Sequence, residues 1–230
     1  MAGPTVGQHT QQRYMSIHPV KKPIILIGGG GHCLAAIDVI ELDGQYEIRG
    51  ILDLPEKVGS TIQDYPVIGT DEDIEELVKE CRDFHITVGQ IKSSAIRERI
   101  FKRVKKAGGM LPVIISPLAY VSPNAQVGEG SIVMHQALVN AGATVGNVSI
   151  VNSKALIEHE ATIGDFCHIS TGAVINGQAH IGDRCFIGSN AVVSNNVRIT
   201  ENTLVAAGAQ VLKNISIPGT YGINPLRKIR

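Results

Sequence analysis

The stretch VNSKALIEHEATIGDFCHISTGAVINGQAHIGDRCFIGSNAVV, residues 151–193, repeats one pattern every six residues. An aliphatic side chain returns at each sixth position, with a small side chain two residues before it and often glycine or asparagine directly after it. A period of six that holds without a slip from Val121 to Ile217 is not explained by chance. The aliphatic positions of the full repeat are Val121, Val127, Val133, Val139, Val145, Val151, Ile157, Ile163, Ile169, Ile175, Ile181, Ile187, Val193, Ile199, Val205, Val211 and Ile217.

A period of six fits neither a single α-helix nor an ordinary sheet. It fits short strands joined by tight turns, where each hexad forms one side of a three-sided coil and its β-branched residue points inward. We expect the following glycine or asparagine, such as Gly146, Asn152 and Gly164, to form the corner with a positive φ. The repeat therefore predicts a parallel β-helix over residues 117–230. Periodicity leaves its handedness open, and a purely structural solenoid would show the same repeat.

Residues 22–116 have a different character, because strand-like apolar runs alternate with helical patterns. This alternation predicts a small Rossmann-like parallel α/β domain ahead of the β-helix. We expect strands at 22–28, 46–53 and 84–89, helices at 33–42, 71–81 and 93–106, and a closing apolar run at 110–116.

The run GGGGH, residues 28–32, lies between the first predicted strand and the first predicted helix. Glycines there let backbone amides approach a phosphate at a helix N-terminus. The GxGxxG frame ends in Cys33, where a dinucleotide site requires glycine or alanine, so the loop favours a nucleotide other than NAD. Asp53, at the end of the second predicted strand, is placed for a ribose hydroxyl. A structural glycine turn is the alternative.

Polar residues interrupt the repeat around Asn152, His159, Glu160 and His168. His159 lies two residues after an inward position, so we expect it on the outer surface of a coil. An imidazole with a pKa near about 6.5 suits the removal of a proton from an amine during acyl transfer. Glu160 could orient it, and the N–H of Gly177 could stabilise an oxyanion. The plain alternative is a solvated surface histidine.

Metal binding is the other chemistry that histidines on a β-helix could provide. The β-helix carbonic anhydrases hold zinc partly with two histidines five residues apart. The repeat contains His135, His159, His168 and His180, and no two of them have that spacing. The sequence therefore predicts no metal site.

Charge and composition narrow the classes of partner. Lys plus Arg and Asp plus Glu number 21 each, so we expect neither nucleic acid nor a membrane as a partner.

The four cysteines show no CxxC spacing and should be reduced and buried. No apolar run reaches the roughly 20 residues of a spanning helix, and we expect a cytoplasmic protein. Residues 1–21 are polar, without a period, and are typical of a disordered leader.

Residues 23–230 resemble the sugar O-acyltransferases of the sialic-acid and bacillosamine type. The resemblance rests on GGGGH (28–32), ILD (51–53), NSKALIEHEATIGDFCHIS (152–170) and GINPLRK (222–228). It implies a left-handed β-helix, a homotrimer, acetyl-CoA as co-substrate and no metal. The substrate it implies is a nucleotide-linked amino-deoxysugar, in particular a 4-amino-4,6-dideoxyhexose, which would be N-acetylated. O-acetylation of a sialic acid, or a non-catalytic nucleotide-sugar-binding scaffold, are the alternatives.

The resemblance also implies roles for single residues. His159 would be the general base with Glu160 as its partner, Gly177 would meet the thioester carbonyl, and Asn152 would lie near the sugar. Leu54 stands where the bacillosamine enzymes have a second acidic residue, which leaves the nucleotide open. The positions implied to contact acetyl-CoA are His168, Ser189 and Ala207, and those implied to form the nucleotide-sugar pocket are Gly30, Gly31, His32, Asp53 and Gly89.

Overall fold

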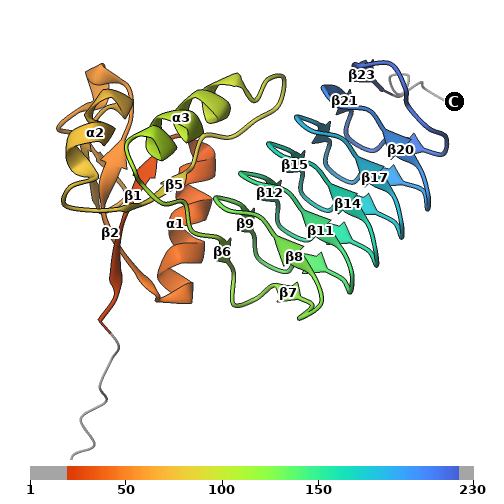
Figure 1. Ribbon diagram of the computed structural model, residues 1–230, viewed down its shortest axis with the longest axis horizontal. Helices are drawn as coiled ribbons and strands as arrows, with labels where there is room; N and C mark the ends of the chain where they lie inside the picture. The colour runs from red at the N-terminus through yellow and green to blue at the C-terminus, as the bar shows by residue number, and fades with distance from the viewer. Residues whose placement is uncertain (1–19, 223–230) are drawn as a thin grey trace, which may run out of the picture.

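The computed structural model describes residues 20–222, which form a small α/β domain followed by a three-sided β-helix (Figure 1). The predicted leader lies outside the described residues except for Val20 and Lys21, and the GINPLRK motif does so except for Gly222. Within residues 20–222, no helix is long and apolar enough to cross a membrane.

The first domain contains a five-stranded sheet in the order β3-β4-β2-β1-β5. All neighbouring strands run parallel except β3 and β4. Its strands are β1 (Lys22–Ile27), β2 (Tyr46–Leu52), β3 (Thr61–Ile62), β4 (Tyr65–Gly69) and β5 (Asp83–Ile86). Its helices are α1 (Gly31–Asp43), α2 (Ile74–Leu77) and α3 (Ala95–Lys106), with 3₁₀ turns at Pro55–Lys57 and Asp71–Asp73. This is the Rossmann-like arrangement that the sequence predicts.

The strand β1 is buried on both of its faces, as a central parallel strand requires. Ile24 and Leu26 pack with α1, whereas Ile25 and Ile27 pack with α2 and α3. The helix α1 ends at Gly44, whose φ of 71° places it in the left-handed region and whose N–H donates to Ile40 O. These contacts hold the start of α1 at the carboxyl end of β1.

Two predicted elements of this domain are shorter than expected. The helix predicted at 71–81 starts as expected with a capping box of Thr70 and Asp73, but it consists of the 3₁₀ turn and the short α2. After α2 the chain continues in turns, where Lys79 N donates to Glu76 O and Glu80 N donates to Leu77 O. The strand predicted at 84–89 runs from Asp83 to Ile86, and directly after it the Thr87 hydroxyl donates to Gly28 O.

The second domain stacks its strands into three parallel sheets, which we call the first, second and third faces. The first face contains β6 (Ile114–Ile115), β9 (Ile132–Val133), β12 (Ile150–Val151), β15 (His168–Ile169), β18 (Phe186–Ile187), β21 (Thr203–Val205) and β23 (Gly219–Tyr221). The second contains β7 (Tyr120–Val121), β10 (Leu138–Val139), β13 (Leu156–Ile157), β16 (Val174–Ile175), β19 (Val192–Val193) and β22 (Gln210–Val211). The third contains β8 (Gln126–Val127), β11 (Thr144–Val145), β14 (Thr162–Ile163), β17 (His180–Ile181) and β20 (Arg198–Ile199).

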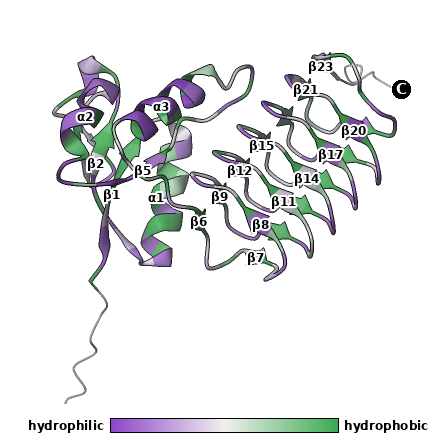
Figure 2. Ribbon diagram, viewed as in Figure 1, coloured by the Kyte–Doolittle hydropathy of each residue, from purple (hydrophilic) through white to green (hydrophobic). Residues whose placement is uncertain are grey.

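The repeated aliphatic residues point inward, as the period predicts. Val151 pairs with Val133 on one side and with Ile169 on the other, so equivalent positions stack one coil apart. These side chains and the small residues before them form one continuous buried core. Figure 2 shows hydrophobic residues following the strands of the coil. All four cysteines are buried and free.

The corners differ from the prediction. The positive φ falls three residues after the inward residue, for example at Val148 (49°) and Glu160 (57°), and not at the residue directly after it. A glycine directly after the inward residue serves close stacking instead: a Cβ on Gly164 would lie 2.7 Å from Asp183 N in the next coil. Glycine is needed there because the coils approach backbone to backbone.

The register of the last coil is also corrected. The repeat predicts an inward Ile217, but this side chain is 70% exposed. Ile215 takes the inward position and forms a bridge with Ile199. The last coil is therefore two residues shorter, because Ile199 and Ile215 are 16 residues apart whereas other stacked positions, such as Ile181 and Ile199, are 18 apart.

The first face carries the α/β domain. Ile132, Met134 and Ile150 project outward from this face into the core that contains α1. We call the turns after the first, second and third faces the first, second and third corners. The α/β domain thus packs on the first face where β6, β9 and β12 lie. The second corner of each coil lies at the far edge of the second face.

Candidate active site

His159 lies on the second corner, directly outside the coil, as predicted from its position after Ile157. Its side chain is 53% exposed, and its Nδ1 lies 3.5 Å from Glu160 Oε2. Gln178 Nε2 donates to the same Glu160 oxygen at 2.9 Å. This bond first, and then His159, holds the pKa of the Glu160 carboxyl below its usual value. Glu160 is therefore an anchored carboxylate beside the imidazole.

The other side of the imidazole faces Gly177, one coil along. A Cβ at position 177 would lie 2.5 Å from His159 Nε2 and 3.2 Å from Asn195 Nδ2. Only glycine leaves room for the ring at this place. Within residues 20–222 no hydrogen bond uses the Gly177 N–H. The corner thus joins a ring nitrogen, a carboxylate and a free backbone donor, which together can move a proton and stabilise an oxyanion.

Sequence reasoning missed two supports of this corner. Gln178 fixes Glu160, and Glu158 Oε2 accepts both from His159 N at 3.1 Å and from Asn140 Nδ2 at 2.9 Å. Gln178 is one coil, 18 residues, after Glu160. Stacking of equivalent positions is the signal that could have identified both.

The glycine loop and Asp53 come together at the carboxyl end of β1. Gly30 caps α1 and Gly31 is its first residue; a Cβ added to either would meet no atom within 4 Å, so the space in front of the helix is open. A Cβ on Gly29 would lie 2.5 Å from Asp53 Oδ2, so this glycine allows the loop to contact Asp53. The open helix N-terminus is suited to an anion.

Asp53 is held by its own neighbours. Its Oδ1 accepts from Leu54 N at 2.9 Å and its Oδ2 accepts from Lys57 Nζ at 2.7 Å. Lys57 was not foreseen from the sequence. Asp53 and Leu54 line a small cavity together with Val88 and Ile96. Gly89 lies beside this region, against the Cβ of His32.

His168 is not on an open surface, because it lies between the two domains. It is 9% exposed, its Nδ1 donates to Gln90 O at 2.7 Å, and its Nε2 is 3.1 Å from Asn152 Nδ2. Its ring centroid is 6.4 Å from that of His32. Burial first, and then other contributions including the charge of Arg97, lowers the pKa of His168 to about 4 and that of His32 to about 3. Both rings are therefore neutral at ordinary pH.

Within one chain, the site residues that the sequence predicts on the β-helix lie on two different corners. Asn152, Ser189 and Ala207 lie on the first corner, whereas His159 and Gly177 lie on the second. The Ser189 hydroxyl lies 2.9 Å from that of Ser170, in the coil before it. One side of the triangle separates the two groups in every coil.

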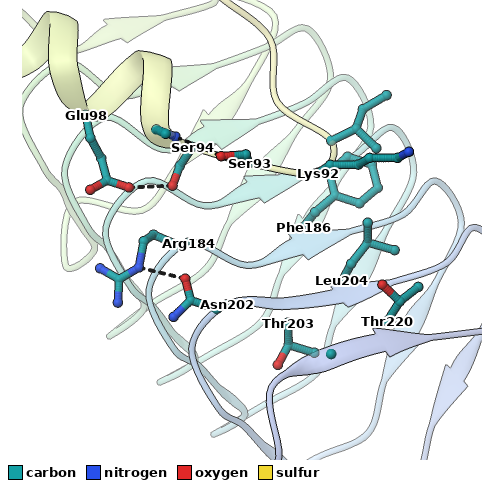
Figure 3. Close-up of a pocket in the computed structure, with 13 residues that line it drawn as sticks. Lys92, Ser93, Ser94, Glu98, Arg184, Phe186, Asn202, Thr203, Leu204 and Thr220 are labelled. Carbon is teal, nitrogen blue, oxygen red and sulfur yellow. Dashed lines mark hydrogen bonds between the residues drawn. The ribbon is translucent and has the colours of Figure 1, made fainter.

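A cavity of about 540 Å³ opens between the start of α3 and the first face (Figure 3). Phe186 and Leu204 form its apolar wall, and Arg184, whose Nε donates to Asn202 Oδ1 at 2.9 Å, lies at its edge. None of the predicted site residues lines it.

Within residues 20–222, no group of three His, Cys, Asp or Glu side chains is arranged to hold a metal ion.

Comparison with known proteins agrees with both domains. Residues 23–104 match the PglD N-terminal domain, and residues 178–213 match the bacterial transferase hexapeptide repeat. The acetyltransferase domain of PglB from Neisseria gonorrhoeae FA1090, solved in complex with acetyl coenzyme A, is 32% identical. The alignment covers 91% of this chain and 100% of that domain, with a TM-score of 0.82. This chain belongs to the hexapeptide-repeat sugar acetyltransferases of the PglB and PglD type.

Other members and relatives extend the comparison. PerB from Caulobacter crescentus, solved with CoA and GDP-perosamine, is 26% identical over 88% of this chain and 95% of its own, with a TM-score of 0.80. The uncharacterized protein L142 of Acanthamoeba polyphaga mimivirus is 37% identical over 119 residues, which are 52% of this chain and 22% of that protein. The acetyltransferase family therefore accounts for the left-handed β-helix and for the domain that precedes it.

Proposed function

We propose that this acyltransferase uses acetyl-CoA to N-acetylate a nucleotide-linked amino-deoxysugar, in particular a 4-amino-4,6-dideoxyhexose. The observation that carries the proposal is the second corner, where His159 Nε2 lies over Gly177 while Nδ1 lies beside the anchored Glu160 carboxylate. PerB, the relative solved with CoA and GDP-perosamine, supports both the donor and the class of acceptor.

The reaction is a direct transfer. The sugar amine attacks the thioester carbonyl, a C–N bond forms, the C–S bond breaks, and CoA leaves as a thiolate. His159 Nε2 takes the proton that the nitrogen loses and returns it to the thiolate. Glu160 stabilises the imidazolium that forms in between. The free N–H of Gly177 donates to the oxygen on which negative charge develops.

The nucleotide sugar would be bound by the α/β domain. The open amides of Gly30 and Gly31, at the start of α1, suit the diphosphate, and the buried Nε2 of His32 has no partner among the described residues. Asp53 and Gly89 would face the nucleoside, and Asn152 would contact the sugar. Acetyl-CoA would lie along the first corner, against Ser189 and Ala207, with His168 beneath it.

We also propose a homotrimer whose active sites lie between protomers. Threefold packing would bring the first corner of one protomer, with Asn152, to the second corner of the next, with His159. The outward residues of the four middle strands of the second face support this arrangement, because they are apolar and partly exposed: Leu138, Leu156, Val174 and Val192. The corresponding residues of the third face are polar: Gln126, Thr144, Thr162, His180 and Arg198.

The test is release of CoA from acetyl-CoA in the presence of UDP-, GDP- and dTDP-linked 4-amino-4,6-dideoxyhexoses. The matching 4-hydroxy sugars and free sialic acid serve as hydroxyl acceptors, so turnover on these alone would replace N-acetylation by O-acetylation. No turnover on any amine would overturn the proposed reaction. Light scattering should give three times the mass of one chain, and a monomer would remove the proposed site between protomers.

A further inference from the structure

A chain of hydrogen bonds crosses from the α/β domain to the first corner of the β-helix. It begins at Arg97 on α3, which is 1% exposed. Arg97 Nη1 donates to Gln90 Oε1 at 2.9 Å, and Nη2 donates to Val148 O on the third corner. Gln90, in the loop between β5 and α3, is 4% exposed. Arg97 therefore ties this loop to the β-helix.

The next link fixes the tautomer of His168. The partner of His168 Nδ1 is the carbonyl oxygen of Gln90 at 2.7 Å, and a carbonyl can only accept. The ring is neutral, so its single proton is on Nδ1 and Nε2 is an acceptor. The atom 3.1 Å from Nε2 is Asn152 Nδ2, which donates to it.

The last link fixes the amide of Asn152. Its Oδ1 accepts from Ser153 N at 2.8 Å, and one hydrogen of Nδ2 goes to His168. With both ends assigned, the amide cannot flip without losing both bonds. One N–H of Nδ2 remains for a substrate oxygen.

The charge of Arg97 favours the same state of the ring. The charge of Arg97 lowers the pKa of three histidines from three different elements, namely His32 of α1, His85 of β5 and His168 of β15, and no carboxylate among the described residues bonds to the guanidinium. Arg97 Nε itself has no partner within residues 20–222. A second positive charge on His168 would be repelled, which keeps its Nε2 free to accept.

We propose that Arg97 and Gln90 are positioning residues of the acceptor site, which act through His168 to fix the direction in which Asn152 presents its amide to the sugar. The proposal rests on the proposed function, because it takes Asn152 as a sugar contact. In this proposal His168 orients Asn152, because both of its ring nitrogens are hydrogen-bonded, one to Gln90 and the other to Asn152. Acetyl-CoA would then meet no ring nitrogen of His168.

The first experiment needs no substrate. Two-bond ¹⁵N–¹H correlation of the histidine rings, with His168 assigned by its loss in His168→Gln, should show the Nδ1-protonated tautomer in the wild-type protein. Arg97→Met, which keeps the length of the side chain and removes its donors, should give a mixture of tautomers. Arg103→Met is the matched control on the same helix, because Arg103 only pairs with Glu72 at the surface. A wild-type ring protonated on Nε2 would overturn the proposal even if the protein turned over no sugar.

The second experiment measures whether Arg97 and Asn152 act on substrate binding together or independently. With the aminosugar nucleotide that is turned over, Arg97→Met should raise its KM about tenfold, the loss of one hydrogen bond to a substrate, and leave the KM of acetyl-CoA unchanged. In an Asn152→Ala background the same substitution should have no further effect on KM. The proposal would be overturned if Arg97→Met and Asn152→Ala had additive effects on KM, or if Arg97→Met changed both KM values equally. Either result would mean that Arg97 only holds the two domains together. If Arg97→Met does not fold, Gln90→Met removes the same bond and replaces it in both experiments.

Discussion

The second corner and the interdomain seam, which contains Gln90, Arg97, His168 and Asn152, place polar groups in opposite ways. At the second corner the groups come from positions one coil apart, and His159 is 53% exposed. In the seam they come from segments far apart, such as Gln90 and His168, which are 78 positions apart. Gln90, Arg97 and His168 are buried and Asn152 is half-buried. The corner resembles a surface site built from repeats, whereas the seam resembles a protein core.

This difference implies different consequences of mutation. An exposed corner can lose a side chain without loss of packing, so its residues should affect chemistry more than stability. A buried seam holds groups whose desolvation has a cost, so its residues should affect stability and its dependence on pH. Substitutions in each region, measured for both activity and stability, can therefore separate the two behaviours.

Removal of the imidazole should have the largest effect. We expect His159→Ala to lower kcat by about 10²- to 10⁴-fold, the usual contribution of a positioned base, with an unchanged melting temperature. Steady-state CoA release and thermal unfolding measure the two quantities. His180→Ala, an exposed histidine on the third face, is the control and should retain full activity. Full activity in His159→Ala would remove the proposed base.

Gly177→Ala tests whether the position of the ring matters as much as its presence. The new Cβ would overlap His159 Nε2 and Cε1, at 2.5 and 2.6 Å, and must push the ring away from its place. A misplacement of about 1 Å can reduce the rate about 10²-fold, and we expect a loss of kcat of that order. The melting temperature should change little, because the ring moves into solvent. An unchanged kcat would show that the ring need not lie over Gly177.

The neighbours at the second corner follow from the sequence because stacking brings together residues one coil apart. His159 and Gly177 are 18 residues apart, so the repeat alone brings them together. The same repeat could not predict that His168 is buried, because what covers it comes from another domain. A signal was present: outward residues of the first face are apolar at Ile132, Ile150, Phe186 and Leu204.

Positions that depend on backbone contact were also predicted poorly. Glycine after the inward residue was interpreted as a positive-φ corner, but Gly164 is required by the approach of Asp183 N. Sequence shows which residue tolerates a conformation and not which contact demands it. In the same way, the sequence shows Arg97 as one of several basic residues on an amphipathic helix, and only the fold shows that it is buried.

A buried histidine of the α/β domain, His85 on β5, should make stability depend on pH. Burial first, and then the charge of Arg97, lowers the pKa of His85 to about 4. Its ordinary value is 6.5, so between these values the unfolded chain binds a proton that the folded protein does not. Stability is therefore complete above about pH 6.5 and is lost as pH falls toward about 4, by roughly 1.4 kcal/mol per pH unit for this one histidine.

His85→Leu should remove that contribution. We expect the free energy of unfolding, measured with urea between pH 6.5 and 5, to fall less steeply with pH than in the wild-type protein. The difference between the two slopes should correspond to about one proton taken up on unfolding. Carboxylates titrate in both proteins and cancel in the difference. Phe84→Leu, a neighbouring buried substitution on β5 without a titratable group, should keep the wild-type slope. Equal slopes in the wild-type and His85→Leu proteins would show that folding does not lower the pKa of His85.

The smallest expected effect is that of Gln178, whose side chain donates to Glu160 and not to the imidazole. Gln178→Leu removes the bond that does most to lower the pKa of Glu160, and leaves the carboxylate free to rotate away from His159. One such bond is worth about 1 kcal/mol, which corresponds to roughly a fivefold lower kcat, with unchanged KM values. Gln126→Leu, at an exposed glutamine on the third face, is the control. A loss as large as that of His159→Ala would mean that Glu160 does more than orient the ring, whereas no loss would mean that the corner holds its histidine by stacking alone.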